Sequence, residues 1–167
     1  KVCIIGTTPS RGLAPFNDPS WDIWTIGPGG RDMLGHRWDR LFEIHGAGKY
    51  HTWPADFGEY LNDLSKVEPP RQVVTIRPIK EMVQDWGYQH QKTPADVSKE
   101  IAGSWKANLV LNRDALVEKY GRMWMSSSFS WALADALELK PLPERIGVFG
   151  VDLETGETSV LRVIAAN

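Results

Sequence analysis

The sequence contains a single cysteine, Cys3, so no disulfide bond can form within the chain. It also lacks a long apolar run, since none reaches the roughly 18 residues that a membrane-spanning helix requires. No signal peptide is recognisable, because Lys1 leads directly into a short apolar segment. We therefore expect a cytoplasmic protein without a membrane partner, in which Cys3 is a small buried apolar residue.

An excess of charge of one sign is missing as well. The 19 Lys and Arg residues nearly balance the 21 Asp and Glu residues, and the formal net charge is −2. Such a balance gives no overall attraction to nucleic acids or to anionic membranes. It leaves room for a local basic patch and for a nucleic acid as the acceptor of a transferred group.

The best-known catalytic and metal-binding motifs are absent too. The sequence has no Walker motif, no GxSxG elbow and no HExxH segment. His36, His51 and His90 do not have metal-ligand spacing with a cysteine or with a cluster of carboxylates. We therefore expect no metal site and no structural zinc.

What is present fits one folded domain. A chain of 167 residues, 42% apolar and 24% charged, is long enough to bury a core, so residues 1–167 are predicted to form a single nucleotide-binding α/β domain. Eight tryptophans are spread over the chain. We expect most of them between helices and sheet, while a minority could line a cleft and stack on a base or sugar ring.

The opening segment, KVCIIGTTPS, organises the rest of the chain. Val2–Ile5 is a continuous apolar run, typical of a strand buried on both faces. In doubly wound α/β domains the loop after such a strand lies at the carboxyl edge of the sheet, where ligands bind. Its glycine would let a ligand approach the backbone, and its hydroxyls would donate to phosphate or ribose oxygens; the alternative is a simple turn with a helix N-cap at Ser10. The loop residues are Gly6, Thr7, Thr8, Pro9 and Ser10.

Short apolar runs that end in glycine or a polar residue recur along the chain. The further strands that they predict are Asp22–Ile26, Leu41–Ile44, Val73–Ile76 and Ile146–Val151. The helices expected between them are Arg31–Arg40, Trp53–Ser65, Pro78–Trp86, Trp105–Tyr120 and Ser126–Leu139. This alternation predicts an α/β fold, a single Rossmann-like domain with a mostly parallel sheet and helices on both faces.

Three segments follow this pattern less well. Leu13–Ser20 is expected to be an irregular connection, and Gly87–Ser104 is a polar stretch that could form a lid. Thr158–Ile164 has the character of a strand, but it follows Asp152 too closely for a parallel crossover. Two explanations stay open: an antiparallel hairpin turns at Glu154–Glu157, or residues of the natural protein are missing between Asp152 and this strand.

Polar segments after the predicted strands should meet at the carboxyl edge of the sheet. These segments are Gly6–Ser10, Gly27–Gly30, Glu43–Gly46 and Asp152. His45 is the first candidate for a catalytic base, with Glu43 on the same sheet face to orient it, and Asp152 is the second. The alternatives are a histidine that merely ends a strand and an aspartate that belongs to a turn.

The start of the predicted helix Ser126–Leu139 supplies a fifth piece of this site. Ser126, Ser127 and Ser128 offer three hydroxyls beside exposed backbone N–H groups, a combination that suits a phosphate. The alternative is ordinary N-capping by one serine, although three serines exceed what one cap needs.

Two pairs of segments resemble known families. IIGTTPS with DIWTIG, and SSSFSWALADALEL with IGVFGVDL, are similar to bacterial sialyltransferases of the Campylobacter type and to the motility-accessory-factor and pterin-pyrophosphokinase-like proteins. In both groups a G-x-G-P-S loop and a T-S-G or similar helix start flank a nucleotide, and a strand ending in G-x-D follows. The sequence also resembles small tailed-phage proteins with F-E-I-H, S-S and G-V-D segments, which implies a Rossmann-like, nucleotide-binding phage protein of the host cytoplasm.

The resemblance implies roles for individual residues. Gly6, Thr7, Pro9 and Ser10 match the opening nucleotide loop, and Ser126–Ser128 match the T-S-G segment. These residues would therefore contact the nucleotide.

The sequence also departs from the sialyltransferases. Gly27 and His45 stand where those enzymes carry nucleotide-binding asparagines, and their downstream catalytic histidine has no counterpart here. A fold relative that uses another donor therefore explains the sequence better than a true sialyltransferase does.

The leading hypothesis is a group transferase, glycosyltransferase-like, that binds a nucleotide or a nucleotide-sugar donor. The opening loop and the helix start would neutralise the departing phosphate, while a base activates an acceptor hydroxyl. One alternative is a non-catalytic protein that sequesters a nucleotide or signalling molecule. The other is a nucleotide pyrophosphokinase or hydrolase, for which Asp152, Glu154 and Glu157 are the local carboxylates available to magnesium.

Overall fold

The fold is built on a parallel β-sheet. The computed structural model describes residues 1–26, 35–44, 72–78, 81, 84, 91, 108–122 and 127–151. Its six strands are ordered β5-β4-β3-β2-β1-β6, and β1 is parallel to β2 and β6, β2 to β3, and β4 to β5. This confirms the predicted α/β class. The chain divides into two compact units, Lys1–Phe42 with Asn112–Asn167 and Glu43–Leu111, which are described in turn.

The centre of the first unit is β1, the strand predicted from the opening segment. All four residues of β1 (Val2–Ile5) are buried, because each is apolar and both faces of the strand are covered. The neighbouring strands are β2 (Asp22–Ile26), β3 (Arg40–Glu43) and β6 (Ile146–Phe149). In this register Ile5 lies opposite both Thr25 of β2 and Phe149 of β6, so these strands reach their carboxyl ends together.

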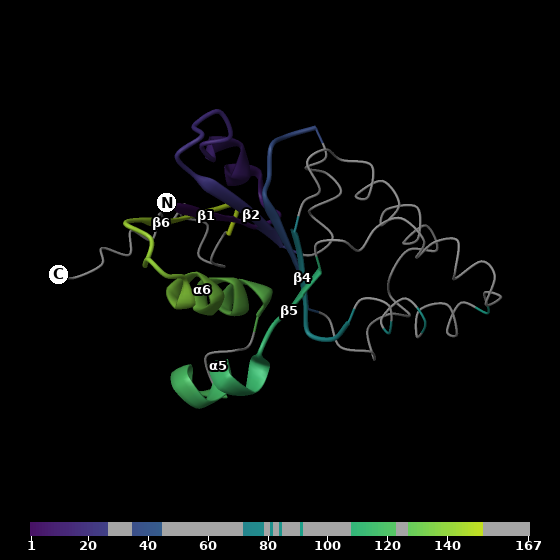
Figure 1. The fold of residues 1–167 in the computed structure, drawn as a ribbon. Coiled ribbons are helices and arrows are strands. Elements are labelled where there is room, and N and C mark those ends of the chain that lie inside the picture. Colours follow the sequence, from purple (N-terminus) through teal and green to yellow (C-terminus); the bar gives the residue numbers. More distant parts are fainter. Residues whose placement is uncertain are drawn as a thin grey trace. The chain divides into compact units, whose positions relative to one another are not determined.

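Helix α6 (Ser128–Glu138) packs against β1 and β2 and lies below them in Figure 1. Its buried side, which includes Trp131, Ala132 and Ala136, follows the helical period expected from the sequence. The chain leaves Glu138 and soon enters β6, so the helix runs back along the sheet. The first turn of α6 therefore lies toward the carboxyl ends of the strands.

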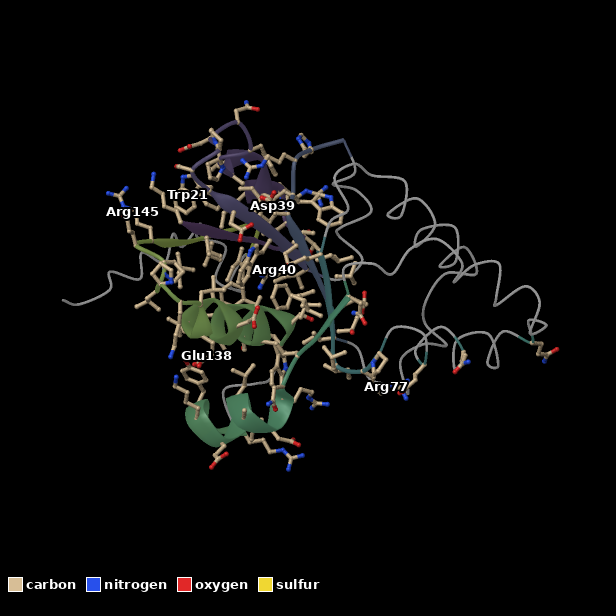
Figure 2. All side chains as sticks on the ribbon, in the orientation of Figure 1. Trp21, Asp39, Arg40, Arg77, Glu138 and Arg145 are labelled. Carbon is tan, nitrogen blue, oxygen red and sulfur yellow. The ribbon has the colours of Figure 1, made fainter. Side chains whose placement is uncertain are left out.

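An ion pair fixes α6 to the sheet. Arg40 Nη1 at the start of β3 lies 2.7 Å from Asp135 Oδ2 of α6, and the Arg40 guanidinium lies 4.3 Å from the centre of the Trp24 ring. Figure 2 shows Arg40 between the sheet and the helix. Burial raises the pKa of the Asp135 carboxyl, and the positive charge of Arg40 opposes this rise.

The connection from β1 to β2 begins with a short 3-10 helix, η1 (Pro9–Leu13), which contacts β6. Thr8 precedes it as the N-cap residue without a side-chain capping bond, while Ser10 lies inside the helix. The remainder, 14–21, forms no helix or strand, in agreement with the irregular connection expected there. In Figure 1 this connection lies above the strands, opposite α6.

The predicted helix Arg31–Arg40 is wrong over its described part. Residues 35–39 are not helical, and Arg40 already belongs to β3. The Asp39 N–H donates to Ile23 O at 2.7 Å, and the Ile23 N–H donates to Asp39 Oδ2 at 2.8 Å. These two bonds hold Asp39 against β2, so the local helical pattern is overridden by pairing with a distant strand.

The second unit contains β4 (Gln72–Thr75) and β5 (Asn108–Val110). The latter corrects the predicted helix Trp105–Tyr120, whose described first part is a strand. Asn108 Nδ2 donates to Val73 O at 3.0 Å and to Thr75 Oγ1 at 2.9 Å. Pairing with β4 therefore decides the conformation here, which the local sequence did not indicate.

The helix predicted in that segment begins later, as α5 (Arg113–Tyr120) in the first unit. Asn112 Oδ1 accepts a hydrogen bond from the Ala115 N–H at 3.2 Å and so caps the new helix start. Lys119 and Tyr120 at the end of α5 both donate to Glu138 of α6. Figure 2 shows Glu138 between the two helices.

Buried aromatic rings and the single cysteine agree with the sequence-based expectations. Trp24, Trp38 and Trp131 are buried, whereas Trp21 is half-buried. Burial raises the pKa of the Cys3 thiol to about 12, so this side chain is an uncharged member of the core. Among the residues described, no helix is long and apolar enough to cross a membrane.

Several predicted elements lie outside the described residues. They are Trp53–Ser65, the segment Thr158–Ile164 and, except for single residues, Pro78–Trp86 and Gly87–Ser104.

Candidate functional site at the carboxyl ends of β1 and β6

The loops that follow β1 and β6 are joined by backbone hydrogen bonds. The Gly6 N–H donates to Phe149 O at 2.8 Å, and the Thr8 N–H donates to Gly150 O at 3.0 Å. A Cβ atom at Gly6 would lie 2.2 Å from Gly150 O, which is too close for any side chain. Gly6 is therefore required for contact with the β6 loop, a reason for glycine that the opening segment alone did not indicate.

Gly150 is the second glycine of this contact. Its φ is +69°, in the left-handed region that favours glycine, and a Cβ there would lie 2.8 Å from Arg11 Cβ. Sequence reasoning selected its neighbour Asp152 and missed Gly150. The available signal was a glycine at the end of the apolar run Ile146–Phe149.

The hydroxyls of the β1 loop differ in their surroundings. Ser10 Oγ accepts a hydrogen bond from the Gly150 N–H at 3.2 Å and lies 3.4 Å from Thr8 Oγ1. Thr8 and Ser10 are half-buried, whereas Thr7 and Pro9 are exposed. Of the predicted loop residues, Thr7 therefore presents the hydroxyl that is most accessible to solvent.

The position of these loops in the sheet is the one where open α/β sheets bind ligands. From β1 the chain continues to β2 and β3 on one side, and later adds β6 on the other side of β1. The strand order therefore reverses between β1 and β6. In folds of this kind ligands bind outside the carboxyl ends of the strands at such a reversal point.

The start of α6 contains two of the three predicted serines. Ser127 is the N-cap residue, and its Oγ accepts from the Ser130 N–H at 3.3 Å and lies 3.1 Å from Ser130 Oγ. Ser128 is the first helical residue and is half-buried. Ser127 thus has the capping role that was the alternative to phosphate contact. The first turn of α6 lies toward the carboxyl ends of the strands.

A buried hydroxyl that sequence reasoning did not select lies near this edge. Thr25 is 1% exposed and pairs with Ile5, one residue before the β1 loop. Its Oγ1 has no hydrogen-bond partner within the described part of the chain. A buried hydroxyl in this state costs stability, in the range of about 1–3 kcal/mol.

Gly27, His45, Ser126 and Asp152 lie outside the described residues. Glu43, proposed to orient His45, is the last residue of β3 and is buried. The described ranges contain no group of three or more His, Cys, Asp or Glu side chains that could hold a metal ion.

A pocket lies elsewhere in the first unit, along the connection between β1 and β2. It has a volume of about 590 Å³ and contains none of the predicted site residues. Within it Phe16 stacks on His36, with ring centres 4.6 Å apart. It is lined by Gly12, Ala14, Pro15, Phe16, Asn17, Asp18 and His36.

Comparison with known proteins adds no family assignment. No protein-family model, no curated protein and no solved structure matches the chain.

Proposed function

We propose that the protein binds a nucleotide or a nucleotide-linked donor at the carboxyl ends of β1 and β6. The observation that carries this proposal is the direct contact of the β1 and β6 loops at the point where the strand order reverses. The exposed Thr7 lies between Gly6 and Thr8, which form this contact, and the first turn of α6 lies toward the same edge. Hydroxyls and a helix start are suitable partners for phosphate oxygens.

The reaction that we propose is group transfer of the glycosyltransferase-like type. In such a reaction the β1 loop and the start of α6 would neutralise negative charge on the departing phosphate. His45 would remove the proton of the acceptor hydroxyl, with Asp152 as the second candidate for that role. The proposal for these two residues rests on their positions after predicted strands.

A thermal-shift screen against nucleotides and nucleotide sugars tests the binding proposal. A ligand present at 100 times its dissociation constant stabilises the folded state by about 2.7 kcal/mol, which is a measurable rise in Tm. Thr7→Ala should reduce the rise, whereas Ser20→Ala should leave it unchanged because Ser20 lies before β2, bonded to Lys1. The absence of any shift with the whole panel would contradict the proposal.

A second experiment separates an enzyme from a binding protein. If His45 is the base, His45→Ala should abolish turnover of the bound donor while the nucleotide dissociation constant changes by no more than a few-fold. Binding without turnover in the unmodified protein would instead favour a sequestering function.

A further inference from the structure

The hydrogen bonds between the β1 and β6 loops use most of the backbone donors of the candidate site. The N–H groups of Gly6, Thr8 and Gly150 all donate to atoms of the opposite loop. Pro9 has no N–H group. In the β1 loop, Thr7 is the residue whose N–H and hydroxyl make no hydrogen bond to another residue within the described part of the chain.

Ser10 has a different part in this arrangement. Its Oγ receives the Gly150 N–H across a separation of 140 residues, while the Gly150 carbonyl receives the Thr8 N–H. Both backbone groups of Gly150 are therefore held by the β1 loop. Since Gly150 has a left-handed φ, these two bonds fix the direction in which the chain leaves β6.

We propose that Ser10 and Gly150 are positioning residues, which hold the β6 loop against the β1 loop, and that Thr7 makes the β1 loop's contact with the ligand. This inference rests on the proposed function, because it divides the roles within the same site. Ser10 was expected to contact the nucleotide, whereas here it acts indirectly, by holding Gly150. It also adds Gly150 to the site, although that residue has no side chain to offer.

The physical basis is preorganisation. A loop that already has its bound conformation loses less conformational entropy when the ligand binds. Removal of the Ser10 hydroxyl leaves the Gly150 N–H without its acceptor, so the β6 loop gains freedom before binding. Removal of the Thr7 hydroxyl leaves the loop contact intact and deletes only a ligand contact.

The test compares Ser10→Ala, Ser10→Thr and Thr7→Ala in two measurements. Amide hydrogen exchange, followed by NMR without ligand, reports the Gly150 N–H directly. Calorimetric titration with CDP, UDP, ADP and GDP reports affinity. Ser10→Ala should accelerate exchange at Gly150 by about tenfold and weaken the best nucleotide by a similar factor. Ser10→Thr, which keeps a hydroxyl, should preserve both properties.

Thr7→Ala supplies the contrast. It should weaken nucleotide binding and leave exchange at Gly150 unchanged. Unchanged exchange at Gly150 in Ser10→Ala, or full affinity in that variant, would overturn the positioning role. Full affinity in Thr7→Ala would overturn the assignment of the ligand contact. Failure of the unmodified protein to bind any of the four nucleotides would instead overturn the proposed function itself. The exchange rate of the Gly150 N–H, measured without ligand, would still test whether Ser10 holds the β6 loop.

Discussion

In the first unit, the segments at the amino edge and those at the carboxyl edge of the sheet are held by different kinds of contact. At the amino edge, Arg37 donates to Asp18 O, Trp21 O and Asp39 Oδ2 at 3.1, 2.6 and 3.0 Å, and Lys1 Nζ donates to Ser20 Oγ at 3.0 Å. Figure 2 labels Trp21 and Arg145, which come just before β2 and β6, at this edge.

At the carboxyl edge, backbone atoms of the β1 and β6 loops meet directly at Gly6 and Gly150. The contact there uses the N–H groups of Gly6, Thr8 and Gly150 and the hydroxyl of Ser10. Long charged side chains hold the amino edge together, whereas backbone groups and one small side chain join the loops at the carboxyl edge. The candidate site is placed at the carboxyl edge because the strand order reverses there between β1 and β6.

The largest expected effect comes from filling the space between the two loops. Gly6→Ala would place Cβ 2.2 Å from Gly150 O, and a backbone atom cannot move aside as a flexible side chain does. We expect a loss of about 3 kcal/mol in the free energy of unfolding, measured by urea denaturation.

Gly12→Ala is the matched control for this substitution. Gly12 lies in η1, and a Cβ there would meet nothing within 4 Å. Its stability should stay within about 0.5 kcal/mol of the unmodified protein. Equal stability of the two variants would mean that the loops do not approach as closely as the structure shows.

Elements whose conformation is determined by their own residues were predicted correctly, whereas elements held by contacts with distant strands were not. β1, β2 and α6 were predicted correctly, because an apolar run or a capped amphipathic stretch carries its own signal. Residues 35–39 and the strand β5 were predicted wrongly, because Asp39 and Asn108 take their conformations from hydrogen bonds to distant strands.

The candidate site shows the same limit. Gly6 was selected from the pattern of the opening segment, but the approach of Gly150 that demands glycine there was invisible in that segment. The capping role of Ser127 was foreseen as one of two alternatives. Ligand contact at the loop and at the helix start stays a prediction.

Substitutions at the amino edge should change the free energy of unfolding and leave nucleotide affinity unchanged. Arg37→Ala removes three hydrogen bonds from a guanidinium that is 37% exposed, so solvent weakens the loss. We expect a decrease of about 1–2 kcal/mol in the free energy of unfolding, with nucleotide affinity unchanged. The free energy of unfolding of Arg37→Lys should lie between those of the unmodified protein and Arg37→Ala, because an ammonium keeps the charge but lacks the planar geometry of the guanidinium. Weakened nucleotide binding in Arg37→Ala would remove the functional distinction between the edges.

The start of α6 separates capping from ligand contact. Ser127→Ala should lower the free energy of unfolding by about 1 kcal/mol through loss of the bond to the Ser130 N–H. If the helix start binds phosphate, Ser127→Ala with Ser128→Ala should also weaken nucleotide affinity by about tenfold or more. Ser130→Ala keeps the N-cap bond and serves as the control. Lower Tm with unaltered affinity in the double variant would leave the serines with a purely structural role.

Lowering the pH should reduce the contribution of Asp18 at the amino edge to the free energy of unfolding. Hydrogen bonds from Ser20, together with the charge of Lys1, lower the pKa of Asp18 below its ordinary value of 3.8. Because the pKa of Asp18 is lower in the folded than in the unfolded state, its carboxylate stabilises the fold. This stability is fully present above the unfolded-state pKa and is lost as the pH falls through the folded-state pKa. Asp18→Asn should therefore be less stable than the unmodified protein at pH 7, and the difference should shrink in thermal melts below about pH 4. A difference independent of pH would assign the effect to packing rather than to charge.

The smallest expected change in stability is at Thr25, whose hydroxyl is buried beside Ile5 without a hydrogen-bond partner in the described residues. Thr25→Val keeps the shape and replaces the hydroxyl by a methyl group, so the unfolding free energy should change little or rise, by up to about 1 kcal/mol. A purely structural Thr25 predicts this result with nucleotide affinity unaltered. If the hydroxyl instead serves a ligand at the carboxyl edge, Thr25→Val would be stable yet bind nucleotide more weakly, because one polar contact is lost without any change in the loops. Urea denaturation and calorimetric titration of the same variant distinguish these outcomes, and a large loss of stability would contradict the unpartnered state of this hydroxyl.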